Sequence, residues 1–317
     1  MRRCRFALML AVLVLSSVSF QAQTRRSALD YYKDGNDKLH NDDLDGAIAD
    51  FTKAIDISLH PESKAVEKGS LNVANGFSER ETEATEVYVV DPLTAEAFVS
   101  RGFARYHKGD VDGAMLDFER ALRINPRNAT AYLDRGSVRY SKGDAQGAIS
   151  DWEKALQINP QLGDAYANRG AVRQRLGDVD GAFADLNRAI ELDMHDERAF
   201  CNRGFIWNDK RVPERAIADF DQALKINPRL AWAYEGRGVA HMMNVEFDAA
   251  IEDFSRAVQL DPDMAAAYMN RGLTLLLEHK DEAAQADFSR ALRLNPALKT
   301  EVEERSKLAK DVRAAKR

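Results

Sequence analysis

The strongest constraint on the fold is a repeat of 34 residues that runs without a gap from Ala95 to Leu298. Six copies follow one another in register, and their first residues are Ala95, Ala129, Gly163, Glu197, Ala231 and Ala265. A period of this length is typical of arrays in which each unit packs mainly against its neighbours. The repeat therefore predicts a stack of similar units rather than one central core.

Within each copy the same residue types return at the same positions. The first copy has Phe98 at position 4, Gly102 at position 8, Ala114 at position 20, Phe118 at position 24 and Ala121 at position 27. The other five copies keep an aromatic residue, glycine, alanine, a large apolar residue and alanine at these positions. Five of the six copies end in proline at position 32, and Met194 is the exception.

These columns predict two helices in each copy that cross closely. A glycine inside a helix costs about 1 kcal/mol relative to alanine, so a column of glycines opposite small alanines indicates a close helix crossing. Between the helices lie turns such as Lys108-Gly109-Asp110, in which glycine suits the left-handed end of the first helix and aspartate the N-cap of the second. Asn125-Pro126 and its equivalents are expected to end the second helix.

The pattern resembles the tetratricopeptide repeat, which combines W-x2-L-G-x2-Y with A-x3-F and a closing proline. One departure is systematic, because all six copies carry arginine where the family has leucine before the glycine. The resemblance implies an all-α fold, a right-handed α-solenoid of antiparallel helix pairs. It also implies that the first helices line a concave groove that binds peptide segments of partner proteins.

The rest of the chain is assigned around this array. Residues 24–61 hold a weaker first repeat, which starts at Ala28 and has Leu59 where proline belongs. Residues 62–94 match no position of the pattern and are interpreted as an acidic, mobile insert, with a degenerate repeat as the alternative. Residues 95–298 hold the six repeats, and residues 299–317 are expected to form a polar C-terminal helix that caps the last one.

Residues 1–23 have the layout of a secretory signal peptide. Arginines at positions 2, 3 and 5 precede an apolar run that is short for a membrane span, and small residues follow. We expect an exported protein, periplasmic or secreted and from a bacterial host; an uncleaved N-terminal anchor is the alternative. After cleavage Cys201 is the one cysteine left, so neither an intramolecular disulfide nor a cysteine metal cage is expected. The formal charge of −6 argues against a generic nucleic-acid binder.

Two charged columns suggest ion pairs that join neighbouring repeats. Arginine stands at position 7 and aspartate at position 23, and the two form bidentate hydrogen bonds. We predict that each aspartate pairs with the arginine of the following repeat, because the first repeat lacks the arginine and the C-terminal helix supplies one. The predicted inter-repeat ladder consists of Asp50 with Arg101, Asp117 with Arg135, Asp151 with Arg169, Asp185 with Arg203, Asp219 with Arg237, Asp253 with Arg271 and Asp287 with Arg305. A basic stripe for phosphate or nucleic acid is the less favoured interpretation.

Helical spacing turns positions 2, 5, 6, 9, 12 and 13 of each repeat toward the groove. Asparagine at position 6, in Asn168, Asn202 and Asn270, could hold the backbone of a bound peptide, because its amide both donates and accepts hydrogen bonds. Trp232, Met242 and Met243 could supply apolar contacts. For the asparagines, the alternative is that they are solvated or bond neighbouring turns. For the apolar residues, the alternative is that many belong to the core, buried beneath the tail or where the superhelix tightens.

No catalytic chemistry is expected. The six histidines are scattered without metal-ligand spacing, and neither a phosphate-binding loop nor a nucleophile elbow is found. We therefore predict no cofactor, no metal, no membrane span after signal cleavage and no enzymatic activity. The expected function is that of an adaptor that binds a protein or peptide partner. The alternative is a structural envelope scaffold or a self-associating protein.

Overall fold

The computed structural model describes residues 26–59 and 92–315, and all regular elements in these ranges are helices. They fall into two units, one ending at Asp144 and one starting at Ala145, which are described separately. The predicted signal peptide and residues 62–91 of the predicted insert lie outside the described residues.

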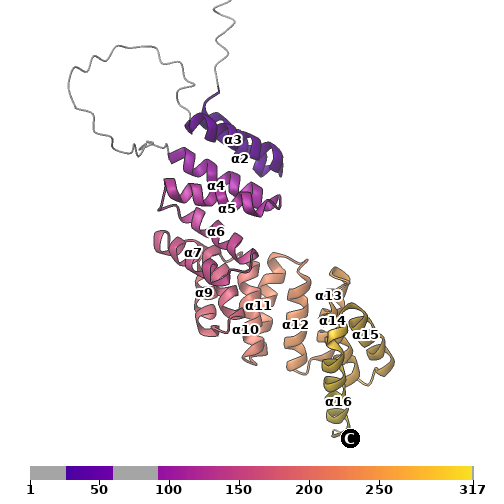
Figure 1. The fold of residues 1–317 in the computed structure, drawn as a ribbon. Helices are drawn as coiled ribbons and strands as arrows, with labels where there is room; N and C mark the ends of the chain where they lie inside the picture. Colours follow the sequence, from indigo (N-terminus) through magenta and orange to yellow (C-terminus); the bar gives the residue numbers. More distant parts are fainter. Residues whose placement is uncertain (1–25, 60–91, 316–317) are drawn as a thin grey trace, which may run out of the picture. The chain divides into compact units, whose positions relative to one another are not determined.

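The described part of the first unit, residues 26–59 and 92–144, contains five helices, the indigo-to-magenta part of Figure 1. They are α2 (Ala28–His40), α3 (Leu44–Leu59), α4 (Pro92–His107), α5 (Val111–Ile124) and α6 (Ala129–Ser141). Helices α2 and α3 pack together as a pair, and so do α4 and α5. Helix α4 starts three residues before the repeat copy that it belongs to.

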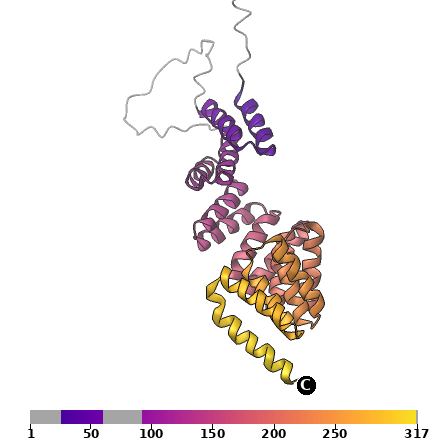
Figure 2. The same ribbon diagram turned by 90° about the vertical axis from the view of Figure 1, so that its right-hand side faces the viewer.

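The second unit continues with paired helices and ends in a further one (Figures 1 and 2). Its elements are α7 (Ala145–Ile158), α8 (Gly163–Arg175), α9 (Val179–Leu192), α10 (Glu197–Asp209), α11 (Pro213–Ile226), α12 (Ala231–Met243), α13 (Phe247–Leu260), α14 (Ala265–Leu277), α15 (Asp281–Leu294), the short 3-10 helix η2 (Pro296–Leu298) and α16 (Lys299–Ala315). Helices α8, α10, α12 and α14 begin on the first residue of a repeat copy. The predicted all-α fold of antiparallel helix pairs is thereby confirmed.

The turns inside the repeats follow the predicted chemistry in three copies. Gly109, Gly143 and Gly177 have φ between +86° and +90°, a left-handed conformation that suits glycine. The Asp110 carboxylate then accepts a hydrogen bond from the Gly113 N–H at 2.9 Å and caps the second helix. Other repeats adopt the same turn without glycine, and one of them holds the β-branched Val245 at a φ of 62°.

The second helices end in a turn that does not depend on proline. Asn125 leaves the helical conformation, and its side-chain oxygen accepts a hydrogen bond from the Arg127 N–H at 3.0 Å. Where proline is missing, Asp193 accepts from the His195 N–H at 2.8 Å in the same way. An Asx turn of this kind ends the second helix without help from proline, which explains why the repeat tolerates Met194 in place of proline.

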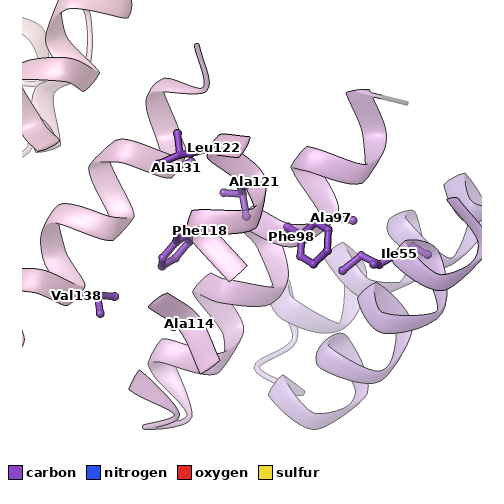
Figure 3. Packing of buried hydrophobic residues seen from close by; sticks show 11 residues of the cluster. Ile55, Ala97, Phe98, Ala114, Phe118, Ala121, Leu122, Ala131 and Val138 are labelled. Atoms are coloured by element: carbon purple, nitrogen blue, oxygen red, sulfur yellow. The ribbon is translucent and has the colours of Figure 1, made fainter. Parts of the chain in front are cut away.

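The core of the first unit shows how the repeat columns pack (Figure 3). Phe98 from α4 and Phe118 from α5 are buried among apolar side chains of α4, α5 and α6, such as Ala97, Leu122 and Val138. A Cβ placed on Gly102 would lie 2.8 Å from Cε1 of Phe118, closer than real contacts allow. The glycine column therefore makes room chiefly for the ring at position 24. The equivalent pairs Gly204–Phe220 and Gly238–Phe254 are as close, at 2.9 and 2.8 Å.

In the second unit the first helices of neighbouring repeats touch one another. Helix α10 contacts both α8 and α12, and α12 contacts α14. Among the described second helices α9, α11, α13 and α15, no pair has a contact of similar extent. The first helices are therefore the more closely spaced layer, and we call the surface that they expose the inner face.

Candidate functional site

The arginine and aspartate columns pair within each repeat, so the predicted inter-repeat ladder is wrong. Nε and Nη2 of Arg203 donate to the two carboxylate oxygens of Asp219 at 2.8 and 2.7 Å. The same bidentate geometry joins four further pairs: Arg101 with Asp117, Arg169 with Asp185, Arg237 with Asp253 and Arg271 with Asp287.

The physical reason is the rotation of the second helix, which turns position 23 toward the first helix of its own repeat. The arginines still connect neighbouring repeats, through a different residue. The remaining Nη1 of Arg203 donates to Asn187 at 2.8 Å, and that of Arg237 to Asp221 at 2.6 Å. Both acceptors stand at position 25 of the preceding repeat.

Both ends of the array depart from the predicted pairing. Asp50 accepts a hydrogen bond from Nζ of Lys38 at 2.6 Å instead of from Arg101. Arg305 donates to Glu301 of its own helix at 3.0 Å, while Asp287 is held by Arg271. Lys38, at position 11 of the first repeat, takes the place of the absent arginine, so the start of the array does not require inter-repeat pairing.

Position 11 forms a second cationic column that the sequence reasoning overlooked. Nη1 of Arg105 lies 2.7 Å from Asp117, and Nη1 of Arg173 lies 2.8 Å from Asp185. In the fifth copy the residue is His241, whose Nε2 lies 3.7 Å from Asp253. Because position 11 stays basic in several copies, the column is visible in the sequence once position 23 is assigned to its own repeat.

These contacts make the charge columns structural. All five of these aspartates are buried. The side chains of their arginine partners are between 6% and 22% exposed. The hydrogen bond to Asp253, opposed by burial, raises the pKa of Arg237, and the bond to Asp287 does the same for Arg271. These five arginines are therefore engaged in ion pairs with their aspartates and do not form a basic stripe that could bind phosphate or nucleic acid.

A cavity of about 640 Å³ opens on the inner face where α8, α10 and α12 meet. We call it the Trp232 cavity, and its lining consists of Ala171, Gln174, Arg175, Arg198, Asn202, Phe205, Asp209 and Trp232. Each of these residues stands at position 2, 6, 9, 12 or 13 of its repeat, as predicted for groove-facing residues. Two of the predicted peptide-binding residues, Asn202 and Trp232, are thus brought together.

An aromatic pair forms the apolar side of this cavity. The rings of Phe205 and Trp232 lie nearly parallel, with centroids 6.2 Å apart and an interplanar angle of 22°. Phe205 also packs over Gly236, where an added Cβ would come within 2.8 Å of its ring. Nδ2 of Asn208 donates to the Gly236 carbonyl at 2.8 Å. This close approach of α10 and α12 sets the position of the two rings.

The opposite side of the cavity is polar and carries both signs of charge. Arg198 bonds Asp164 of α8 at 3.0 Å, which spans the gap between the two first helices. Asn202 is half-buried and lies between this ion pair and the aromatic pair along α10. The arrangement offers an amide and charged groups beside an aromatic surface, which suits recognition of a peptide rather than bond-breaking chemistry.

The other predicted binding residues lie elsewhere. Asn168, Met242 and Met243 are half-buried on α8 and α12 and do not line the cavity. Asn270 is only 6% exposed, and its Nδ2 donates to Glu235 of α12 at 2.8 Å. Its amide is therefore used inside the protein, by a side chain of the preceding first helix rather than by solvent or a neighbouring turn.

The apolar residues at the C-terminal end of the inner face belong to the core. Met269, Leu273 and Leu276 of α14 are buried together with Val302 and Ala309 of α16. Trp232, by contrast, keeps part of its surface exposed. The interpretation of this end as core beneath the tail is the correct one for these α14 residues.

The described residues contain neither a metal-binding cluster nor an exposed cysteine. Across residues 26–59 and 92–315 there is no cluster of three or more His, Cys, Asp or Glu side chains that could hold a metal ion. Cys201 is buried, and burial raises the pKa of its thiol, which disfavours the reactive thiolate. No described helix is both long enough and apolar enough to cross a membrane.

Solved structures with a similar fold include tetratricopeptide repeat proteins. A tetratricopeptide repeat protein from Parabacteroides merdae is 20% identical, covers 89% of this chain and 98% of its own, and gives a TM-score of 0.54. A structure from the functional characterization of Pseudomonas aeruginosa pilF is 20% identical, covers 64% and 92%, and gives 0.57. YrrB, described as a TPR protein with an unusual peptide-binding site, is 21% identical, covers 61% and 97%, and gives 0.50. At these identities the likeness concerns the fold.

Family models match most of the array. A model described as TPR repeat matches residues 102–143 and 136–177, and two models described as tetratricopeptide repeat match residues 163–194, 209–265 and 246–298. No curated protein is similar enough in sequence to count as a relative. The matched stretches span more than half of the 317 residues. The chain therefore belongs to the tetratricopeptide repeat family, whose members generally mediate protein–protein interactions and are typically non-catalytic.

Proposed function

We propose that this protein is a non-catalytic adaptor that binds a segment of a partner protein in the Trp232 cavity. The observation that carries the proposal is the meeting of an aromatic pair, an asparagine amide and a charged rim on the inner face. Aromatic side chains give large apolar contact at a binding surface, and an amide can bond both the N–H and the C=O of a peptide.

The proposed roles follow from these positions. Trp232 and Phe205 contact an apolar side chain of the bound segment, and Asn202 bonds its backbone. Asn168, Met242 and Met243 are proposed as flanking contacts along α8 and α12. Asn270 is left out of the proposed site because its amide is engaged with Glu235.

A peptide selection followed by binding measurements tests this proposal. Peptides selected from a random library on the full chain should bind Trp232→Ala and Asn202→Ala at least about tenfold more weakly, a difference of about 1.4 kcal/mol. Met194→Ala is the matched control, because Met194 is 70% exposed in a turn outside the cavity. If the selected peptides bind all three variants equally, the inner-face site is wrong.

We also propose that the protein is exported, on the strength of the predicted signal peptide in residues 1–23. Mass spectrometry of the protein expressed in a bacterium with a periplasm should find a mature N-terminus close to residue 20 or 23. A cell-associated chain that still starts at Met1 would contradict export by cleavage.

A further inference from the structure

The C-terminal helix does not continue the stacking of the array. In the second unit each second helix contacts the first helix of the next repeat, as α9 does α10, α11 does α12 and α13 does α14. Helix α16 follows α15 and would occupy the equivalent position. It contacts α14 and η2 instead, and has no contact of similar extent with α15. The helix is therefore shifted away from the stacking position.

The apolar side of α16 lies on the inner face of α14. Val302 and Ala309, which are 6% and 7% exposed, pack in one cluster with Met269, Leu273 and Leu276. These three residues of α14 stand at positions 5, 9 and 12 of their repeat, which are groove-facing positions. Helix α16 therefore covers the inner face at its C-terminal end.

A charged residue of α16 reaches further, toward α12. Burial raises the pKa of Glu235 on α12, and the charge of Arg305 on α16 opposes this shift. Glu235 is also the acceptor for Asn270 of α14. The three side chains come from three different helices, although α16 and α12 share no extensive contact.

On the side of α15 the packing of α16 is incomplete. A cavity of about 530 Å³ separates the two helices and is lined by Phe288 and Leu292 of α15 and by Val302 and Ser306 of α16, among others. Oγ of Ser306 is buried there and has no hydrogen-bond partner among the described residues. The helix is held near its end by Arg313, which bonds Asp281 at 2.5 Å and the Leu276 carbonyl at 3.1 Å.

From this geometry we infer that the inner face of α14 is a helix-binding surface and that α16 is its tethered occupant. The external partner that fits is an amphipathic helix with two apolar residues seven positions apart, like Val302 and Ala309. The inference rests on the proposed function to the extent that a partner approaches the inner face.

The tether makes α16 a strong competitor for this surface. A short connection gives a linked segment an effective concentration of the order of millimolar, and η2 joins α16 to α15 through three residues. A free helix at micromolar concentration is then excluded until α16 is weakened. A partner binds by displacing α16.

A peptide with the sequence of residues 299–315, labelled with fluorescein, tests the inference on the full chain. Val302→Asp puts a charge into the α14 contact, and Arg313→Ala removes the anchor at the end of α16. Both variant chains should bind the peptide at least about tenfold more tightly than the wild type, because their own helix occupies the surface for a smaller fraction of time. Leu308→Asp is the control, since Leu308 is 63% exposed on the outer side of α16; this chain should bind like the wild type.

A second peptide that carries Val302→Asp should bind none of the chains. The inference is overturned if the weakened chains bind the wild-type peptide no better than the wild-type chain, or if both peptides bind alike. Circular dichroism shows whether Val302→Asp melts the array; if it does, Arg313→Ala decides the outcome alone. Peptides selected on the Trp232 cavity should bind all of these chains equally, so failure at either surface is recognised separately.

Discussion

Replacing Arg203 by leucine should destabilise the second unit more than the same change at Arg169. The two arginines make equivalent bidentate pairs, with Asp219 and Asp185. They differ at position 11 of the repeat. When Arg169 is lost, Asp185 still has Arg173 at 2.8 Å as a partner. The repeat that contains Asp219 has Trp207 at position 11, and this residue carries no charge to replace Arg203.

The expected magnitudes follow from this difference. Removing one partner of a buried ion pair costs about 3–5 kcal/mol, and we expect about 3 kcal/mol for Arg203→Leu because the arginine is partly solvated. Asp219 is 5% exposed and would lose its arginine partner. For Arg169→Leu we expect about 1.5 kcal/mol, the lower end of the contribution of a hydrogen bond to a charged group, because Arg173 remains.

Thermal melts followed by circular dichroism can measure the difference. In a domain of 150–250 residues, 1 kcal/mol changes the Tm by about 2–4 °C, so Arg203→Leu should lower it by about 6–12 °C and Arg169→Leu by about half as much. Because repeat arrays can unfold in parts, urea unfolding should accompany the melts. Equal losses for the two variants would refute the role given to Arg173.

A double-mutant cycle separates the observed pairing from the predicted one. Adding Asp219→Leu to Arg203→Leu removes the uncompensated carboxylate, so the double variant should be more stable than the sum of the two single losses indicates. Adding Asp185→Leu instead should give nearly additive losses. The opposite result would restore the inter-repeat pairing.

Three further changes test the packing, a turn and a buried carboxyl. Gly102→Ala should cost about 1–2 kcal/mol, because overpacking against Phe118 outweighs the gain in helix propensity, whereas Gly163→Ala, whose nearest side-chain atom is 3.7 Å away, should be neutral or stabilising in urea unfolding. Val245→Gly should raise the stability by about 0.5–1 kcal/mol in the same assay, because glycine relieves the left-handed conformation at the cost of a more flexible unfolded chain. Burial raises the pKa of Glu235 above 4.5, so the folded protein binds this proton more tightly than the unfolded chain does. The stability of the wild type therefore falls as the pH rises through and above 4.5. Glu235→Gln should have a higher Tm than the wild type at neutral pH and should lose this advantage below pH 4.5.

The repeat columns predicted the fold because each is tied to a local requirement. Gly102 has to clear a ring, Asp110 has to cap a helix, and Asn125 has to close one, so residue type and structure coincide. Orientation is a different matter. A column of aspartates on a second helix looks the same whether it faces its own first helix or the next, and Lys38 at the array's start concealed the true pairing.

The candidate site was predictable in part for the same reason. Groove-facing positions follow from helical spacing, and they brought Asn202 and Trp232 to one cavity. The fate of Asn270 depends on Glu235 from another repeat, and the position of α16 depends on a contact with α14 that its sequence satisfies in more than one way. Neither is a property of a single helix.

Because the thiol of Cys201 is buried, its oxidation reports local unfolding of α10. It sits at 0% exposure inside α10, against the helices that frame the Trp232 cavity, so an intact molecule in an oxidising solvent keeps it reduced. A molecule in which α10 is locally unfolded exposes the Cys201 thiol. Two such molecules can then form an intermolecular disulfide. In a Cys4→Ser chain, whose one remaining cysteine is Cys201, the proportion of disulfide-linked pairs in an aged sample therefore reports unfolding of this part of the chain without an added label.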